Sequence, residues 1–163
     1  MRNKKHLLRW ILLLGLFVSF TALQAVEKPV QLSLFAPVQL FPEETSIKGV
    51  RFNLLYGKNT SVYGLDFGLV NHTTSGKTTA VQFGFLGIAD ADFFGWQDNH
   101  INITKGNFEG LQSGVINYAN QMNGVQFGFV NYAGTMNGLQ IGLINIIKQG
   151  GMFPVFPIVN WSF

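Results

Sequence analysis

One short pattern recurs at a fixed spacing near the end of the chain. The segments 110–117, 124–131 and 138–145 each read Gly-x-Gln-x-Gly-x-x-Asn, and each begins 14 residues after the one before. A fixed period means that one supersecondary unit has been copied. The repeat therefore limits the possible folds more strongly than composition does.

Weaker copies precede these three. They begin at residues 64 and 80, and more loosely at residue 49, so the steps along the series are 15, 16, 30, 14 and 14 residues. Because 30 residues is about two units, we expect residues 90–107 to contain a further, degraded copy.

Each copy alternates between apolar and polar or small residues. In the second copy Val125, Phe127 and Phe129 fall on one face, and Gln126 and Gly128 fall on the other. Alternation with a period of two indicates a strand, because successive Cβ atoms of a strand point to opposite faces. No stretch after residue 25 has a helical period, so we expect an all-β protein.

The pattern predicts eight or nine strands with short turns between them. The expected strands are residues 30–40, 47–56, 62–72, 79–89, 94–104, 109–119, 124–133, 138–147 and 153–163, of which 94–104 is the least regular. The Asn-Gly pairs at 123–124 and 137–138 are strong hairpin signals, which predict that neighbouring strands run antiparallel.

Residues 1–25 have the layout of a secretory signal peptide, with a basic start, an apolar stretch and small residues before Ala25. They hold four of the 11 basic residues and none of the eight acidic ones, which leaves residues 26–163 with seven against eight, a net charge of −1. A chain with this balance has no electrostatic basis for binding nucleic acid. We expect residues 26–163 to form a single repeat-containing domain.

A small up-and-down antiparallel β-barrel of about eight strands, built from 14–16-residue repeats, is the first architecture that fits. A transmembrane strand needs about 9–11 residues, and a 14-residue unit supplies that length plus a turn. Phe127 and Phe129 would face lipid, and Gln126 and Gly128 would face a narrow lumen. Tyr118 and Tyr132 would serve as anchors at the membrane interface. The low charge, 12% of residues, favours this arrangement.

A β-solenoid of stacked repeats is the alternative. Copies arranged head to tail are its natural product. Asn117, Asn131 and Asn145, with the earlier Asn71, share one repeat position, as a ladder of stacked amides requires. Arg51 and Asp66 also share a position in adjacent copies, where stacking would make them direct neighbours.

The histidines are the first candidates for acid–base chemistry. Outside the signal segment these are His72 and His100, and the sequence offers Ser75, His72 and Asp66 as a possible Ser-His-acid set. Spacing alone gives these residues no common site, and exposed turn histidines explain them better. We therefore expect no catalytic residues, although a barrel enzyme that modifies lipids stays open as a third possibility.

A cation site is the other candidate. Asp90, Asp92 and Asp98, with Asn99, offer oxygen ligands, but their spacing does not match a calcium-binding loop. A solvated acidic loop explains them better, and the apolar run 93–96 is expected to pack beneath that loop. We expect no metal-binding or cofactor-binding residues.

The repeat resembles that of a family of bacterial surface-repeat proteins made of Gly-Leu-Gln-x-Gly-Leu-x-Asn units, which end in a segment like Phe-Pro-Ile-Val-Asn at 156–160. The alternating stretch that ends on Phe163 also resembles the closing strand of bacterial outer-membrane barrels. These resemblances imply export to the outer membrane or surface of a Gram-negative-type bacterium, but no defined activity. We expect a non-enzymatic structural, adhesive or envelope-interaction protein that contacts outer-membrane lipid; the alternative is a secreted or surface β-solenoid that acts as a binding module. The oligomeric state and any envelope partner stay open.

Overall fold

A computed structural model describes residues 26–163, so the expected signal peptide lies outside the described residues. The described chain forms one sheet in the order β2-β1-β3-β4-β5-β6-β7. Its strands are β1 (Glu27–Phe35), β2 (Val38–Gln39), β3 (Ser46–Asn59), β4 (Val62–Thr73), β5 (Thr78–Ala89), β6 (Phe93–Gln149) and β7 (Val155–Ser162).

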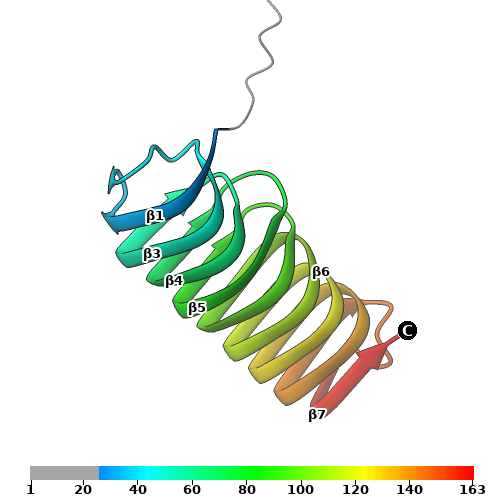
Figure 1. Cartoon of the computed structure of the whole chain (residues 1–163). Coiled ribbons are helices and arrows are strands. Elements are labelled where there is room, and N and C mark those ends of the chain that lie inside the picture. Colours follow the sequence, from blue (N-terminus) through cyan, green and yellow to red (C-terminus); the bar gives the residue numbers. More distant parts are fainter. Residues whose placement is uncertain (1–25) are drawn as a thin grey trace, which may run out of the picture.

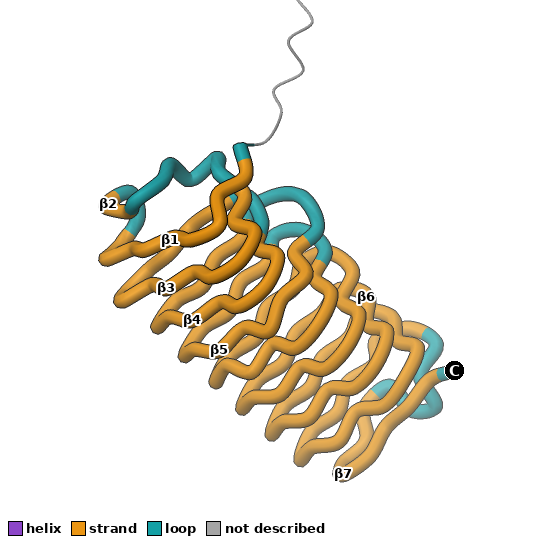
Figure 2. The backbone as a smooth tube through the Cα atoms, in the orientation of Figure 1, coloured by secondary structure: helices purple, strands orange, loops and turns teal. Residues whose placement is uncertain are grey.

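The strands wind as a coil in which each turn lies on the one before (Figure 1). β1, β3, β4, β5 and the start of β6 pair in parallel, one after another. β6 continues as an unbroken ribbon through further turns, and the loops that interrupt the first turns lie along one side of the stack (Figure 2). The expectation of an all-β protein is confirmed, and the architecture is a β-solenoid.

The antiparallel barrel was therefore the wrong expectation, and the stacked alternative is correct. The reason lies in the Asn-Gly pairs. Gly124 and Gly138 have positive φ angles of 133° and 145°, but β6 runs through both without reversing. The glycines turn a corner instead of closing a hairpin, so each copy continues in the same sense and stacks on its predecessor.

The degraded copy predicted within residues 90–107 begins at Gly95. Gly95 pairs with Ala80 of the preceding copy and has a φ of 127°, like the first glycine of the other copies. A Cβ atom on Gly110, the next in this column, would collide with the carbonyl oxygen of Gly95. At Gly110 both the backbone angle and the close approach of successive turns therefore require glycine, whereas Ala80 of the same column has no positive φ angle.

The interior of the coil is unusually polar. The glutamine of each copy points inward and is fully buried, forming a glutamine ladder of Gln82, Gln97, Gln112, Gln126 and Gln140. Each side-chain amide in the ladder donates a hydrogen bond to the amide oxygen of the glutamine one turn earlier, over 2.7–3.1 Å. The ladder satisfies amides that would be costly to bury unpaired.

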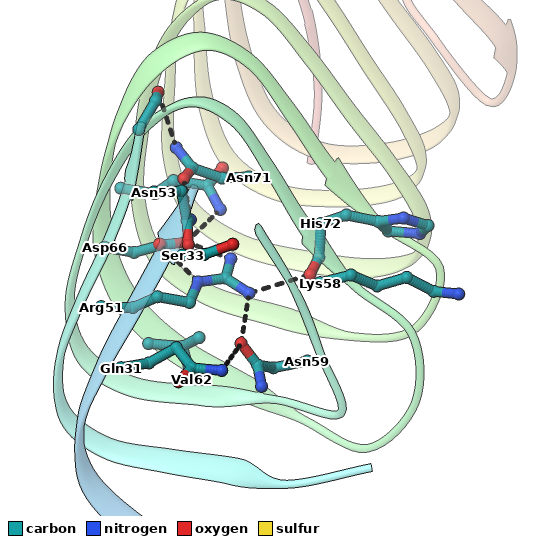
Figure 3. Close-up of polar contacts among 12 residues, drawn as sticks. Gln31, Ser33, Arg51, Asn53, Lys58, Asn59, Val62, Asp66, Asn71 and His72 are labelled. Carbon is teal, nitrogen blue, oxygen red and sulfur yellow. Dashed lines mark hydrogen bonds and ion pairs between the residues drawn. The ribbon is translucent and has the colours of Figure 1, made fainter. Parts of the chain in front are cut away.

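A buried ion pair sets the direction of the ladder. Gln82 donates to Asp66, over 2.7 Å, and Arg51 binds both oxygens of the same carboxylate, each over 2.7 Å. Figure 3 shows the side chains of Arg51 and Asp66 directed into the coil. A carboxylate can only accept, so Gln82 must donate toward it and every later glutamine follows. At the far end the Oε1 atom of Gln140 is left with no partner, as this one-way arrangement requires.

A second ladder, of asparagines, runs the opposite way. Asn102, Asn117 and Asn131 each donate to the asparagine one turn later, the last to Asn145, over 2.8 Å. The same amides also donate to backbone carbonyls of the next turn, as Asn117 does to Phe127 over 3.0 Å. The expected asparagine and Arg51–Asp66 stacks are thus confirmed.

One gap in the asparagine ladder is filled from a different position. Gly87 pairs with Asn71 on one side and Asn102 on the other, where an asparagine would be expected. Asn99, which replaces the second glycine of its copy, donates to Gln82 and Asn102. Its side chain and the Oε1 atom of Gln82 that it binds occupy the space that a Cβ atom on Gly87 would need. The two departures from the pattern compensate each other.

Large apolar side chains occupy little of the interior. The buried apolar residues of the described chain form one cluster: Ile47, Val62, Ala80, Ala89, Phe93, Phe108, Ala119, Met122, Ala133, Met136 and Ile147. The run at 93–96 was expected to pack beneath an acidic loop; it opens β6 instead, and Phe93 stacks on Phe108 with ring centroids 5.5 Å apart.

Both ends of the coil are capped. At the first turn Gln31 closes the interior by bonding the backbone N–H and C=O of Phe41, each over 2.9 Å. At the last turn β7 runs antiparallel to the end of β6. Pro157 and the positive φ of Ile158, 73°, interrupt β7, and such irregularities protect an edge strand from pairing with another chain.

Candidate functional site: an exposed apolar ridge

Most of the large apolar side chains point out of the coil. In each copy the residue after the second glycine and the residue following it both face outward, as Leu143 and Ile144 do between Gly142 and the buried Asn145. Two successive outward side chains break the alternation of a strand, so the chain bends there. Stacked turns align these bends into one convex corner along the solenoid.

The apolar ridge is the set of exposed apolar side chains on either side of this corner: Phe52, Leu54, Leu55, Leu69, Phe85, Val115, Ile116, Phe127, Phe129, Leu143 and Ile144. The outward direction of Phe127 and Phe129 and the inward direction of Gln126 agree with the sequence expectation.

The ridge is larger than scattered surface hydrophobicity explains. Phe85, Phe127 and Phe129 are 48%, 57% and 63% exposed. With about 200 Å² of surface per phenylalanine, these three rings alone expose roughly 340 Å². The largest apolar patch on a typical monomer is about 300–600 Å² in total, and larger patches mark interaction sites.

Two grooves run along the ridge, between the column of Phe127 and the column of Phe129. Near the start of the coil a groove of about 560 Å³ is lined by Leu32, Leu34, Phe52, Leu54 and Phe67, with Asn53 and Gly68 in its floor. Near the end a groove of about 400 Å³ is lined by Phe127, Phe129, Ile141, Leu143 and Ile158, with Gly114, Gly128 and Gly142 in its floor. The glycine column thus leaves room between two apolar walls.

A polar break separates the two grooves. Asp98 and Ser113 stand where other copies have phenylalanine or isoleucine, and the Ser113 hydroxyl donates to Asp98 over 2.8 Å. The indole N–H of Trp96 donates to Ser113, also over 2.8 Å. His100 stacks on Phe85 with centroids 5.2 Å apart.

A strained residue extends the ridge beyond the last full turn. Ile158 is 71% exposed and is the one non-glycine residue of the described chain with a positive φ angle, 73°. A β-branched residue in this region is a genuine outlier, and such strain persists only where the surrounding structure enforces it. Its side chain joins Phe129 and Leu143 in lining the second groove.

The catalytic set drawn from the sequence does not assemble. Asp66 is buried with Arg51, whereas His72 bonds Asp90 through Nε2 and Tyr56 through Nδ1, each over 2.8 Å. Ser75 lies in the exposed loop after β4. Tyr56, His72 and Asp90 are separated in sequence by about one repeat at each step, and this spacing could have indicated that they stack.

The Tyr56–His72–Asp90 stack is a chain of two hydrogen bonds. With Nε2 of His72 donating to Asp90, Nδ1 accepts from the Tyr56 hydroxyl. Burial raises the pKa of Tyr56, which keeps the phenol protonated. Burial also acts to raise the pKa of Asp90, but hydrogen bonds from Lys105 and His72 outweigh it and lower that pKa overall.

The acidic residues considered for a cation do not converge. Asp90 binds His72 and Lys105, Asp92 accepts from the backbone N–H of Asn107, and Asp98 accepts from Ser113. Among residues 26–163 no three His, Cys, Asp or Glu side chains are grouped so as to hold a metal ion. No helix in this part of the chain is long and apolar enough to cross a membrane.

The aromatic residues proposed as interfacial anchors lie beside the ridge. Tyr118 and Tyr132 stack in adjacent turns with centroids 5.0 Å apart, on the strand that follows the corner.

Comparison of the chain with protein-family models, curated proteins and solved structures gave no match. The ridge and its grooves are therefore the feature from which a function has to be inferred.

Proposed function

We propose that this protein is an exported, non-enzymatic β-solenoid that acts as a binding module at the bacterial envelope or surface, with the apolar ridge as its binding surface. The single observation that carries the proposal is the exposed apolar surface aligned over successive turns, which includes Phe127 and Phe129. Burial of apolar area is the dominant favourable term in association, and an unburied patch of this extent is costly in water.

The polar interior supports the same conclusion. The glutamine and asparagine ladders hold the turns together through hydrogen bonds, so the outward phenylalanines and leucines are not needed to form the core. Side chains that do not serve the core are free to serve a surface. The strained Ile158, which extends the ridge at its end, adds weight, because strain of this kind clusters at functional sites.

Export and location belong to this proposal, with the basic and apolar layout of residues 1–25 as their support. The test is to express the full chain in a Gram-negative host and fractionate the cells. We expect cleavage near Ala25, detected by mass spectrometry, and association with the envelope fraction that carbonate releases.

Matched variants test the role of the ridge. The ridge variant carries Phe129→Ser and Leu143→Ser, at side chains 63% and 64% exposed. The control variant carries Phe94→Ser, an exposed aromatic outside the ridge that lies beneath Lys77. We expect the ridge variant to leave the envelope fraction and the control to stay. Equal retention of both would refute the ridge as the binding surface.

A further inference from the structure

We propose that the partner of the apolar ridge is the hydrocarbon of a lipid bilayer, into which the convex corner inserts while the rest of the solenoid stays in water. This inference rests on the proposed function and names the chemistry of its partner. Three properties of the ridge carry it: its scarcity of hydrogen-bonding groups, its convex shape and the lack of an excess of basic side chains around it.

The ridge offers a partner almost nothing to hydrogen-bond. The second groove is walled by carbon side chains such as Phe127, Leu143 and Ile158. The backbone on both sides of the corner is paired from turn to turn, as Gly68 is with Gly84 and Val70 with Leu86, so no open strand edge lies there along the successive turns. A protein interface has about one hydrogen bond per 100–200 Å², and a protein partner would bury polar groups here without partners. Acyl chains have no such groups.

The convex shape also favours lipid over a second copy of the chain. Leu143 and Ile144 project from two sides of one bend, with 64% and 43% of their surfaces exposed. Rigid sheets pack face to face, so a second solenoid would cover one side of the corner and leave the other wet. Fluid acyl chains fit around both sides, as they do around the apolar face of an interfacial helix.

Few charged side chains lie near the ridge, and those that do, such as Lys105 near Ile116, do not select an anionic partner. The exposed ion pairs, Lys48 with Glu27 and Lys105 with Asp90, fall at other repeat positions. Residues 26–163 carry seven basic and eight acidic residues, a net charge of −1. Since there is no excess of basic residues to attract anionic headgroups, insertion should occur in neutral, zwitterionic bilayers and should not weaken with salt.

Asp98 is the exception, and it supplies a sharp test. A carboxylate in the column that also holds Phe83, Ser113 and Phe127 opposes insertion of the middle of the ridge, because charged groups are expensive in hydrocarbon. Replacing it with the residue of the preceding copy, Asp98→Phe, should therefore strengthen binding.

The experiment is flotation of the exported chain, with its N-terminus established by mass spectrometry, on protein-free vesicles of phosphatidylcholine. We expect the wild type to float, the Phe129→Ser/Leu143→Ser variant to lose at least tenfold in partitioning, the Phe94→Ser control to be unchanged, and Asp98→Phe to gain several-fold. Bromine atoms on the acyl chains should quench Trp96, which borders the ridge. Circular dichroism checks that each variant is folded.

Each other result overturns the inference in a recognisable way. The wild type could fail to float with vesicles while its envelope association in cells still depends on the ridge. That result would refute lipid as the partner, keep the ridge as a binding surface and assign it a protein partner. A ridge-dependent dimer in sedimentation velocity without flotation would assign the ridge to a second copy. Flotation that is equal in the ridge variant, or abolished by salt, would show that lipid is bound elsewhere.

Discussion

The glutamine ladder should contribute a measurable part of the stability of the solenoid, and Gln126→Ala tests this directly. Gln126 is fully buried. It donates to Gln112 over 2.7 Å and to the carbonyl oxygen of Tyr132 over 3.1 Å, and it accepts from Gln140 over 2.7 Å. The substitution removes all three bonds at once.

The expected loss follows from what remains behind. The Oε1 atom of Gln112 would lose the donor it has in the ladder, and an unsatisfied buried acceptor costs about 1–3 kcal/mol. A cavity adds to this, because Gln112 and Gln140 are held by their own bonds to the carbonyls of Tyr118 and Ile146 and cannot close the space. We expect a total of about 3–5 kcal/mol, by analogy with large-to-small substitutions in cores.

The assay is urea unfolding followed by circular dichroism, with Gln121→Ala as the control. Gln121 is the same residue type one strand position from the buried Met122, but it is exposed. Its replacement should change stability by less than about 0.5 kcal/mol. A loss below about 1 kcal/mol for Gln126→Ala, or equal losses for the two variants, would show that the ladder does not hold the turns together.

Three further predictions concern other parts of the interior and its rim. Arg51→Gln alone should cost about 3–5 kcal/mol by leaving Asp66 unpaired, whereas Arg51→Gln with Asp66→Gln should recover most of this in urea unfolding, because it continues the glutamine ladder. Gly87→Asn and Asn99→Gly should each destabilise, but the double variant should be more stable than the sum of the single effects predicts, a coupling that a double-mutant cycle measures. The folded state lowers the pKa of Asp90 below its ordinary 3.8, so the stability that Asp90 contributes is present above pH 3.8 and is lost as the pH falls through the folded pKa. Asp90→Asn should therefore flatten this part of the curve of unfolding free energy against pH. An unchanged acid slope in the variant would contradict this prediction.

The side-chain directions and the periodicity could be predicted from the sequence. Alternation placed Gln126 inward and Phe127 outward, because the period-two geometry of a strand is the same whatever it pairs with. The 30-residue step located the hidden copy, which begins at Gly95. The shared positions of Arg51 and Asp66 already indicated contact between adjacent copies.

Strand pairing could not be derived in the same way, because parallel and antiparallel neighbours impose the same alternation on a strand. The backbone at Gly124 decided the matter: its positive φ turns the chain through a corner, whereas the Asn-Gly pair had predicted a reversal. That local angle recurs in every copy except the one that begins at Ala80, and it converts a barrel pattern into a solenoid.

The candidate site shows the same division. The sequence by itself determined that Phe127 and Phe129 face outward and that Gln126 faces inward, since alternation is a property of a single strand. Alternation also put Asn131 on the phenylalanine face, whereas the bend after Phe129 turns it inward. Only the tertiary structure decided that the outward residues align into one ridge, that Ile158 extends it, and that His72 meets Asp90 and not Asp66. These contacts join residues in different turns, and they depend on how the turns are stacked.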